Sequence, residues 1–264
     1  MTMFGFCKNR KPSYLLTLLP VVICLNTLVN TAHAALQEMT TNTKNFELKL
    51  GATRLIYNPA SSGASLSVNN PQDYPILIQG KVYAEDKKTV APFIITPPLF
   101  RLEAGQQSRL RVIRTGGPAI ADRETLNWLC VGGIPPKDTD VWAQDKEGKS
   151  VLNPSSVKLN LEIQTNSCIK LLVRPSSLKS HPLDAASSLT WRHEKGKLIA
   201  INQTAFYMNL KALSVGDKEI KGLNYIAPFS SGSFDLPEKP SGQVKWRVIT
   251  DEGGESRLYQ SPLH

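Results

Sequence analysis

The stretch Val157–Pro175 decides the fold of this chain and reads V-K-L-N-L-E-I-Q-T-N-S-C-I-K-L-L-V-R-P. Apolar residues occupy every second position in its first half, and the same parity continues through Ile169, Leu171 and Val173. This period of two is typical of a β-strand with one apolar face. A single strand over the whole stretch would have about eighteen residues, roughly three times the usual length.

A strand of that length is expected to extend beyond its own sheet. Its second half can be buried in its own domain, whereas its first half carries four apolar residues with no obvious cover in the same chain. We call these four residues the donor row: Val157, Leu159, Leu161 and Ile163. An apolar row on an unpaired strand favours pairing with another protein. It also favours self-association of the free protein.

The N-terminal segment 1–34 has the composition of a cleaved secretory signal peptide. A basic start precedes an apolar run from Leu15 to Val29, and the segment ends in A-H-A, a small-residue cleavage site. An uncleaved membrane anchor is the alternative, but Pro20 and Asn26 interrupt the run and it is short for a span. The segment therefore indicates export.

Short strand-like runs bounded by Gly, Pro, Asn or Asp recur along the rest of the chain, which is typical of antiparallel β-sandwiches. A hinge is expected at Arg174–Pro182, where a proline stands near each end and small polar residues lie between. We therefore predict an all-β protein with an N-terminal domain over 35–176, which includes the donor row, and a smaller C-terminal domain over 177–264.

The formal net charge of +9 falls to +6 without the signal peptide, because 31 basic residues minus three leaves 28 against 22 acidic ones. No dense Lys/Arg run with interleaved aromatic residues is present, so nucleic acid is not an expected partner. No G-x-S-x-G, P-loop, G-x-G-x-x-G or metal-ligand spacing occurs. We expect no enzymatic activity, no cofactor and no metal.

Two cysteines remain after removal of the signal peptide, Cys130 and Cys168. They allow one intramolecular pairing, which an oxidising compartment favours, although two unpaired buried thiols are the alternative. A disulfide would close the base of the long polar stretch Pro135–Pro154.

Arg54 and Lys170 stand out as cations between apolar or β-branched neighbours in predicted strands. Such charges are seldom buried unless they are paired. Spacing alone slightly favours side chains that face water. The alternative is that both point into a cleft between the domains and await a carboxylate.

Five blocks of sequence, in this order, resemble the signature blocks of periplasmic chaperones of the chaperone-usher pathway, the PapD-like family: T-R-L-I-Y (53–57), P-P-L-F-R-L-E-A-G-Q (97–106), R-E-T-L-N-W-L (123–129), G-I-P-P (133–136) and I-K-L-L-V-R-P (169–175). The long polar insert and the two cysteines further resemble the subfamily with a long F–G loop and a disulfide, whose members typically assemble thin fibrils.

This resemblance implies two immunoglobulin-like sandwiches in a boomerang arrangement and a periplasmic location. It implies that the donor row is lent to a pilin-like fimbrial or adhesin subunit, which is then delivered to an outer-membrane usher. Arg54 and Lys170 match the pair that anchors the subunit's C-terminal carboxylate. Glu124, Arg174 and Asp251 match the charges that fix the interdomain angle. An exported immunoglobulin-like adhesin or carbohydrate-binding module is the competing class, since fold does not fix function.

Overall fold

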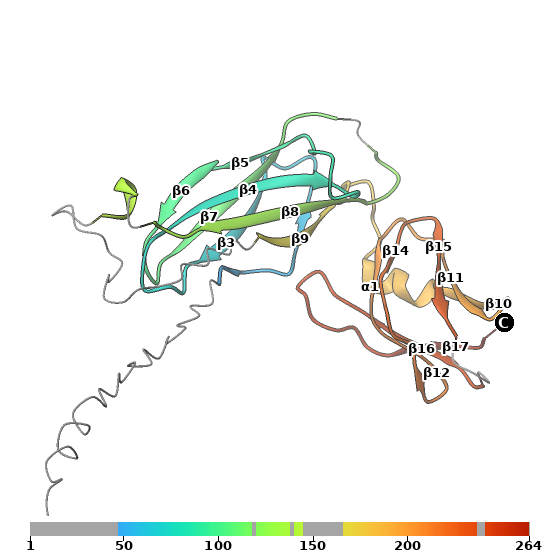
Figure 1. Cartoon of the computed structure of the whole chain (residues 1–264). Coiled ribbons are helices and arrows are strands. Elements are labelled where there is room, and N and C mark those ends of the chain that lie inside the picture. The colour runs from blue at the N-terminus through green and yellow to red at the C-terminus, as the bar shows by residue number, and fades with distance from the viewer. Residues whose placement is uncertain (1–46, 118–119, 138–139, 145–165, 237–240, 264) are drawn as a thin grey trace, which may run out of the picture. The chain divides into compact units, whose positions relative to one another are not determined.

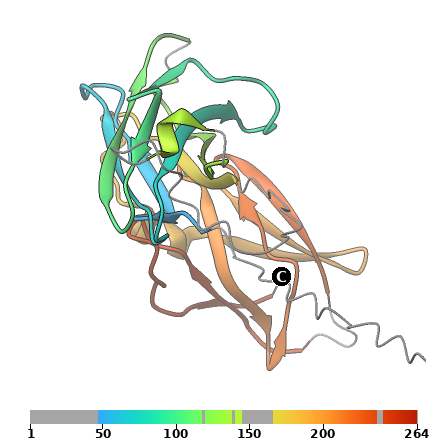
Figure 2. The same ribbon diagram turned by 60° about the vertical axis from the view of Figure 1, so that its left-hand side comes forward.

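The structure, a computed structural model, describes residues 47–117, 120–137, 140–144, 166–236 and 241–263. Within these residues the chain forms two β-sandwiches, one from β1–β9 and one from β10–β17 (Figures 1 and 2). The prediction of two immunoglobulin-like sandwich domains is therefore confirmed. The signal peptide and the donor row lie outside the described residues. No helix in the described part of the chain is long and apolar enough to cross a membrane.

The first sandwich consists of a sheet with strand order β1-β3-β7-β5 and a sheet with order β2-β9-β8-β4-β6. Its strands are β1 (Lys49–Leu50), β2 (Arg54–Tyr57), β3 (Ala64–Asn69), β4 (Ile76–Ala84), β5 (Phe93–Thr96), β6 (Leu99–Leu102), β7 (Gln107–Arg114), β8 (Thr125–Ile134) and β9 (Asn166–Val173). A short 3₁₀ turn, Val141–Ala143, follows β8. All pairs are antiparallel except β2 with β9, which is parallel and was not predicted.

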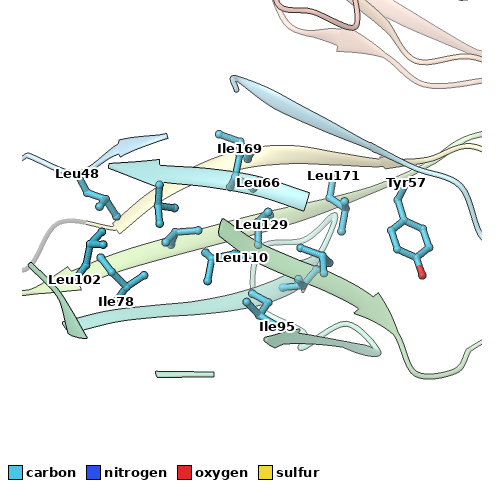
Figure 3. Close-up of a cluster of buried hydrophobic side chains, with 14 of the residues drawn as sticks. Leu48, Tyr57, Leu66, Ile78, Ile95, Leu102, Leu110, Leu129, Ile169 and Leu171 are labelled. Atoms are coloured by element: carbon cyan, nitrogen blue, oxygen red, sulfur yellow. The ribbon is translucent and has the colours of Figure 1, made fainter. Parts of the chain in front are cut away.

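The core of the first sandwich lies between these two sheets. Leu66 and Leu110 come from one sheet, and Leu129 and Leu171 from the other; all four are fully buried (Figure 3). Strand β9 is the second half of the stretch Val157–Pro175. Its odd-numbered apolar residues are buried in this core, as their alternation predicts.

The second sandwich consists of a three-stranded sheet, β10-β11-β15, and a sheet with order β13-β12-β16-β17 in which β14 also pairs with β12. Its elements are α1 (Pro182–Ala185), a 3₁₀ turn (Ala186–Ser188), β10 (Thr190–Glu194), β11 (Lys197–Asn202), β12 (Met208–Val215), β13 (Lys218–Glu219), β14 (Tyr225–Ile226), β15 (Ser230–Asp235), β16 (Val244–Val248) and β17 (Tyr259–Ser261). Trp191 and Trp246 pack in its core with ring centroids 5.3 Å apart.

The named strands of the two sandwiches end at Val173 and resume at Thr190, on either side of the predicted hinge. The boundary at residue 176 stays a prediction. In the connection between β9 and β10, His181 caps α1 by accepting a hydrogen bond at Nδ1 from the backbone N–H of Leu183, 3.2 Å away.

The disulfide between Cys130 and Cys168 is present. The two residues lie directly opposite each other in the β8–β9 pair, with their Cα atoms 4.0 Å apart. Because β8 ends at Ile134 and β9 begins at Asn166, the disulfide closes the base of the long connection between them. The alternative of two unpaired thiols is wrong.

We expect the denatured, non-reduced mature protein to show no reactive thiol. Replacing both Cys130 and Cys168 with alanine should lower the free energy of unfolding by about 4 kcal/mol, because a crosslink spanning 38 positions restricts the unfolded chain. Denaturant unfolding of wild type and double variant measures this difference. Two reactive thiols in periplasmic material would contradict the prediction.

Candidate functional site

Three side chains form a row across the outer face of the sheet β2-β9-β8. The strand register places Arg54 opposite Lys170, and Lys170 opposite Trp128. Residues opposite each other in a sheet share a face, and this face is the one turned away from the core of the first sandwich. Two positions further along the same strands lie Ile56, Leu172 and Leu126, which pack in an apolar cluster with Tyr207 and Tyr225 of the second sandwich.

Lys170 is half-buried against residues of both sandwiches. Its Nζ donates a hydrogen bond to Oδ1 of Asn209 at 2.5 Å and lies 4.9 Å from the ring centroid of Tyr225 and 5.9 Å from that of Trp128. Burial, together with the positive charges of Arg54 and Lys87, lowers the pKa of Lys170 to about 8. This ammonium is therefore held in a place that disfavours its charge.

Arg54 is only 6% exposed. Its Nη1 lies 3.4 Å from the backbone oxygen of Ile249 in the second sandwich, and its buried Nε has no hydrogen-bond partner among the residues that the structure describes. Burial lowers the pKa of Arg54 and outweighs the opposite effects of Asp251 and Glu124. The interpretation that both cations face water is therefore wrong. Among the described residues, neither Arg54 nor Lys170 forms an ion pair with a carboxylate.

The three charges Glu124, Arg174 and Asp251 form one connected network, which we call the acid–arginine triad. Arg174 Nε donates to Oε1 of Glu124 at 2.6 Å. Its Nη1 and Nη2 donate to the two carboxylate oxygens of Asp251 at 2.6 and 2.8 Å. The remaining Glu124 oxygen, Oε2, accepts the backbone N–H of Tyr207 at 2.8 Å. The triad thus joins the first sandwich to the second.

Burial shifts the pKa values of Glu124 and Arg174 in opposite directions. Burial lowers the pKa of Arg174, but its hydrogen bonds to Asp251 and Glu124 outweigh this and raise the pKa overall. Glu124 is 1% exposed, and burial raises its pKa despite the opposing effect of Arg174. The geometry favours an ionised pair, because both Glu124 oxygens accept short hydrogen bonds.

Several contributors to this site gave no signal in the sequence. Asn209 and Tyr225 are brought beside Lys170 by pairing of β12 with β14 in the second sandwich. Glu85 follows β4 and accepts hydrogen bonds from the hydroxyl groups of Tyr207 and Tyr225 at 3.2 and 2.9 Å. In the described residues no group of three or more His, Cys, Asp or Glu side chains gathers as a metal site.

Two family models match the chain, and they divide it in the same way as the sheets. Residues 47–179 match the pili and flagellar-assembly chaperone, PapD N-terminal domain. Residues 184–260 match the pili assembly chaperone PapD, C-terminal domain.

Close relatives and solved structures agree with these matches. The chaperone protein AggD of Escherichia coli is 48% identical over 234 residues, which covers 88% of this chain and 92% of AggD. The crystal structure of the E. coli chaperone DraB is 48% identical, with a TM-score of 0.74, and covers 85% of this chain and all of DraB. A structure of the Salmonella enterica SafA pilin in complex with the SafB chaperone contains a chain that is 47% identical, with a TM-score of 0.74, and covers 84% of this chain and 99% of that one.

The fold and site thus define a two-domain, non-enzymatic assembly chaperone. The chain belongs to the PapD-like family of pilus-assembly chaperones.

The lowered pKa of Lys170 predicts a pH-dependent stability. Its folded value of about 8 lies below the ordinary lysine value of 10.5, so the unfolded chain binds more protons between these pH values. The free energy of unfolding should therefore rise with pH from about 8 to about 10.5 at this site.

Urea unfolding of wild type and Lys170→Met across this pH range measures the effect, since the other titrating groups are common to both proteins. The stability of wild type should increase relative to the variant as pH rises. A difference that stays constant with pH would contradict the lowered pKa.

Proposed function

We propose that this chaperone captures a pilin-like subunit of a fimbrial or fibrillar adhesin by lending it the donor row, anchors the subunit's C-terminal carboxylate at Arg54 and Lys170, and delivers it to an outer-membrane usher. The observation that carries the proposal is the pair of adjacent, desolvated cations, Arg54 and Lys170, without a carboxylate partner in the described chain. A site with this charge and burial suits a carboxylate from another molecule.

The place of Lys170 in the sequence links the two halves of the proposal. Lys170 belongs to β9, and the donor row precedes β9 with the same odd-numbered parity, although the polar residues Thr165 and Ser167 stand at the odd positions between them. Ile163 lies seven positions before Lys170 (170 minus 163), a distance of roughly 23 Å in an extended strand. A subunit held by its carboxylate at Lys170 would therefore have its last strand set in register beside the donor row.

The donor row supplies the apolar contribution. An incomplete sandwich exposes an apolar groove and an unpaired edge, both of which promote aggregation. Four large aliphatic side chains buried in such a groove contribute on the order of 6 to 12 kcal/mol before ordering costs. The strand's backbone groups would satisfy the open edge. Capture of the subunit by the donor row needs no nucleotide hydrolysis.

The acid–arginine triad has a supporting role in this proposal. Its bidentate contact between Arg174 and Asp251 and its buried Glu124 suit a rigid connection between the sandwiches. We propose that it fixes the interdomain angle, so that the second sandwich stays against the cation pair.

The family acts in the periplasm. We propose that the segment 1–34 directs this chain to the periplasm and is cleaved after Ala34.

The carboxylate anchor is tested by Lys170→Ala and Arg54→Ala. Each change leaves the other cation and the bound carboxylate without full pairing, so subunit affinity should fall about 100-fold or more. Lys81→Ala, an exposed change on neighbouring β4, serves as the control. Co-purification of the co-expressed subunit and its dissociation constant are the measurements. Recovery of subunit at the wild-type level by either cleft variant would refute the anchoring role.

The donor row is tested by a scan across residues 157–164. Leu159→Asn and Leu161→Asn should abolish subunit capture and barely change the chaperone's melting temperature, because the row is lent to the subunit. Lys158→Ala and Glu162→Ala, on the opposite face of an extended strand, should have little effect on capture. A scan in which the apolar positions cost the free chaperone several kcal/mol would place the row in its own core and exclude donation.

A further inference from the structure

Arg54 and Lys170 each contact one oxygen atom of the second sandwich, and both of these acceptor oxygens belong to neutral groups. The ammonium of Lys170 donates to the side-chain amide oxygen of Asn209, and Nη1 of Arg54 approaches the backbone oxygen of Ile249. The two acceptors are joined, since the backbone N–H of Ile249 donates to the backbone oxygen of Asn209 at 2.8 Å. The free protein thus presents two neutral oxygens to the cations.

The two acids whose charges act on Arg54 are held by other groups. Asp251 and Glu124 are the acids whose charges act on Arg54, yet all four of their carboxylate oxygens accept hydrogen bonds from other groups. Three of these bonds come from Arg174 and one from the backbone of Tyr207. Neither acid is therefore available to neutralise the cation pair.

The orientation of the Asn209 side chain is fixed by chemistry and by packing. Asn209 is 4% exposed, and its Nδ2 donates to the backbone oxygen of Tyr207 at 3.3 Å. An ammonium can only donate, so the amide must turn its oxygen to Lys170. Pairing of Asn209 with Tyr225 also places the Tyr225 ring beside the same ammonium.

We propose that Asn209 is a positioning residue that orients the Lys170 ammonium without neutralising it, and so keeps the cation pair open to a terminal carboxylate. This inference rests on the proposed anchoring role of Arg54 and Lys170. A neutral acceptor takes one of the three ammonium hydrogens and limits the motion of a flexible side chain. An aspartate in the same place would form an internal ion pair, and an incoming carboxylate would have to compete with a group already present at high effective concentration.

The decisive variant is Asn209→Asp, which keeps the size of the side chain and an acceptor oxygen but adds the charge. Its control is Asn224→Asp, the same change on an exposed residue beside Tyr225, where the side-chain oxygen that accepts from the Tyr225 N–H is retained. The probe is a synthetic peptide of alternating valine and serine with a free C-terminal carboxylate, and its C-terminally amidated twin. Calorimetry gives the dissociation constants, and NMR titration gives the pKa of Lys170.

Wild type and Asn224→Asp should bind the free acid more tightly than the amide. Asn209→Asp should lose this preference, with the free acid bound at least about 30-fold more weakly, and should show a raised pKa of Lys170, as expected for a charged pair in a partly buried site. A merely structural role for Asn209 would leave the acid-to-amide ratio and the lysine pKa unchanged.

The outcomes separate the two proposals. If wild type binds acid and amide equally, the carboxylate anchor itself is wrong. If wild type prefers the acid and folded Asn209→Asp keeps the full preference, the role of Asn209 is wrong. If Asn209→Asp does not fold, Asn209→Ala decides: free-acid binding about three- to tenfold weaker supports positioning, on the scale of the net contribution of one intramolecular hydrogen bond, and wild-type binding overturns it.

Discussion

The parallel pairing of β2 with β9 is the constraint on which the candidate functional site depends. It sets Arg54 directly beside Lys170, an arrangement that like-charge repulsion and burial both disfavour. The rest of the sheet holds the pair in place. β9 lies between β2 and β8, and its odd-numbered apolar residues are buried in the core. The apolar cluster that contains Leu172 lies two residues along the same face as Lys170. Stability gained in the core thus offsets the unfavourable charge arrangement at a functional surface.

The charged groups around Arg54 and Lys170 have different kinds of hydrogen-bond partner. Arg174, four positions after Lys170, donates hydrogen bonds to Glu124 and Asp251. Within the described part of the chain, Arg54 and Lys170 donate to neutral oxygens only. The guanidinium of Arg174 suits this role, because its planar fork can bind two carboxylates at once and a lysine cannot match that geometry. The same triad that joins the sandwiches therefore also keeps Asp251 away from Arg54. One set of hydrogen bonds thus links residues of both sandwiches and occupies the two acids whose charges act on Arg54.

The sequence could predict features that show a clear periodicity, and features for which few arrangements are possible, such as the pairing of two cysteines. The alternation in 166–173 predicted β9 and its buried face, and two cysteines in an exported chain left one pairing. It could not predict β15, where Phe234 is the one buried side chain in S-S-G-S-F-D, nor β6, which follows two prolines. The burial of Arg54 and the contact of Lys170 with Asn209 also gave no signal, because the contacting groups belong to the second sandwich. Ile249 lies 195 positions from Arg54, and Asn209 lies 39 positions from Lys170. The alternation in a strand predicts that a side chain lies on the outer face of the sheet. Whether that face is exposed to water depends on the contacts that the second sandwich makes with it.

The apolar residues of the donor row and those of β9 that lie in the core share one parity in the stretch Val157–Pro175, which fits the two uses that we propose for this strand. Ile169, Leu171 and Val173 are odd-numbered and lie in the chaperone's core, while Lys170 is even-numbered and faces outward. In an uninterrupted strand the donor row, which is also odd-numbered, would continue the core face beyond the chaperone's own sheet. Under the proposed function, the residues lent to the subunit are apolar and suited to another sandwich's interior, whereas Lys170, the proposed anchor, lies on the other face. A register slip of one residue would exchange the two faces. The disulfide at Cys168, five positions after Ile163 (168 minus 163), pins the β8–β9 register near the junction between the two halves.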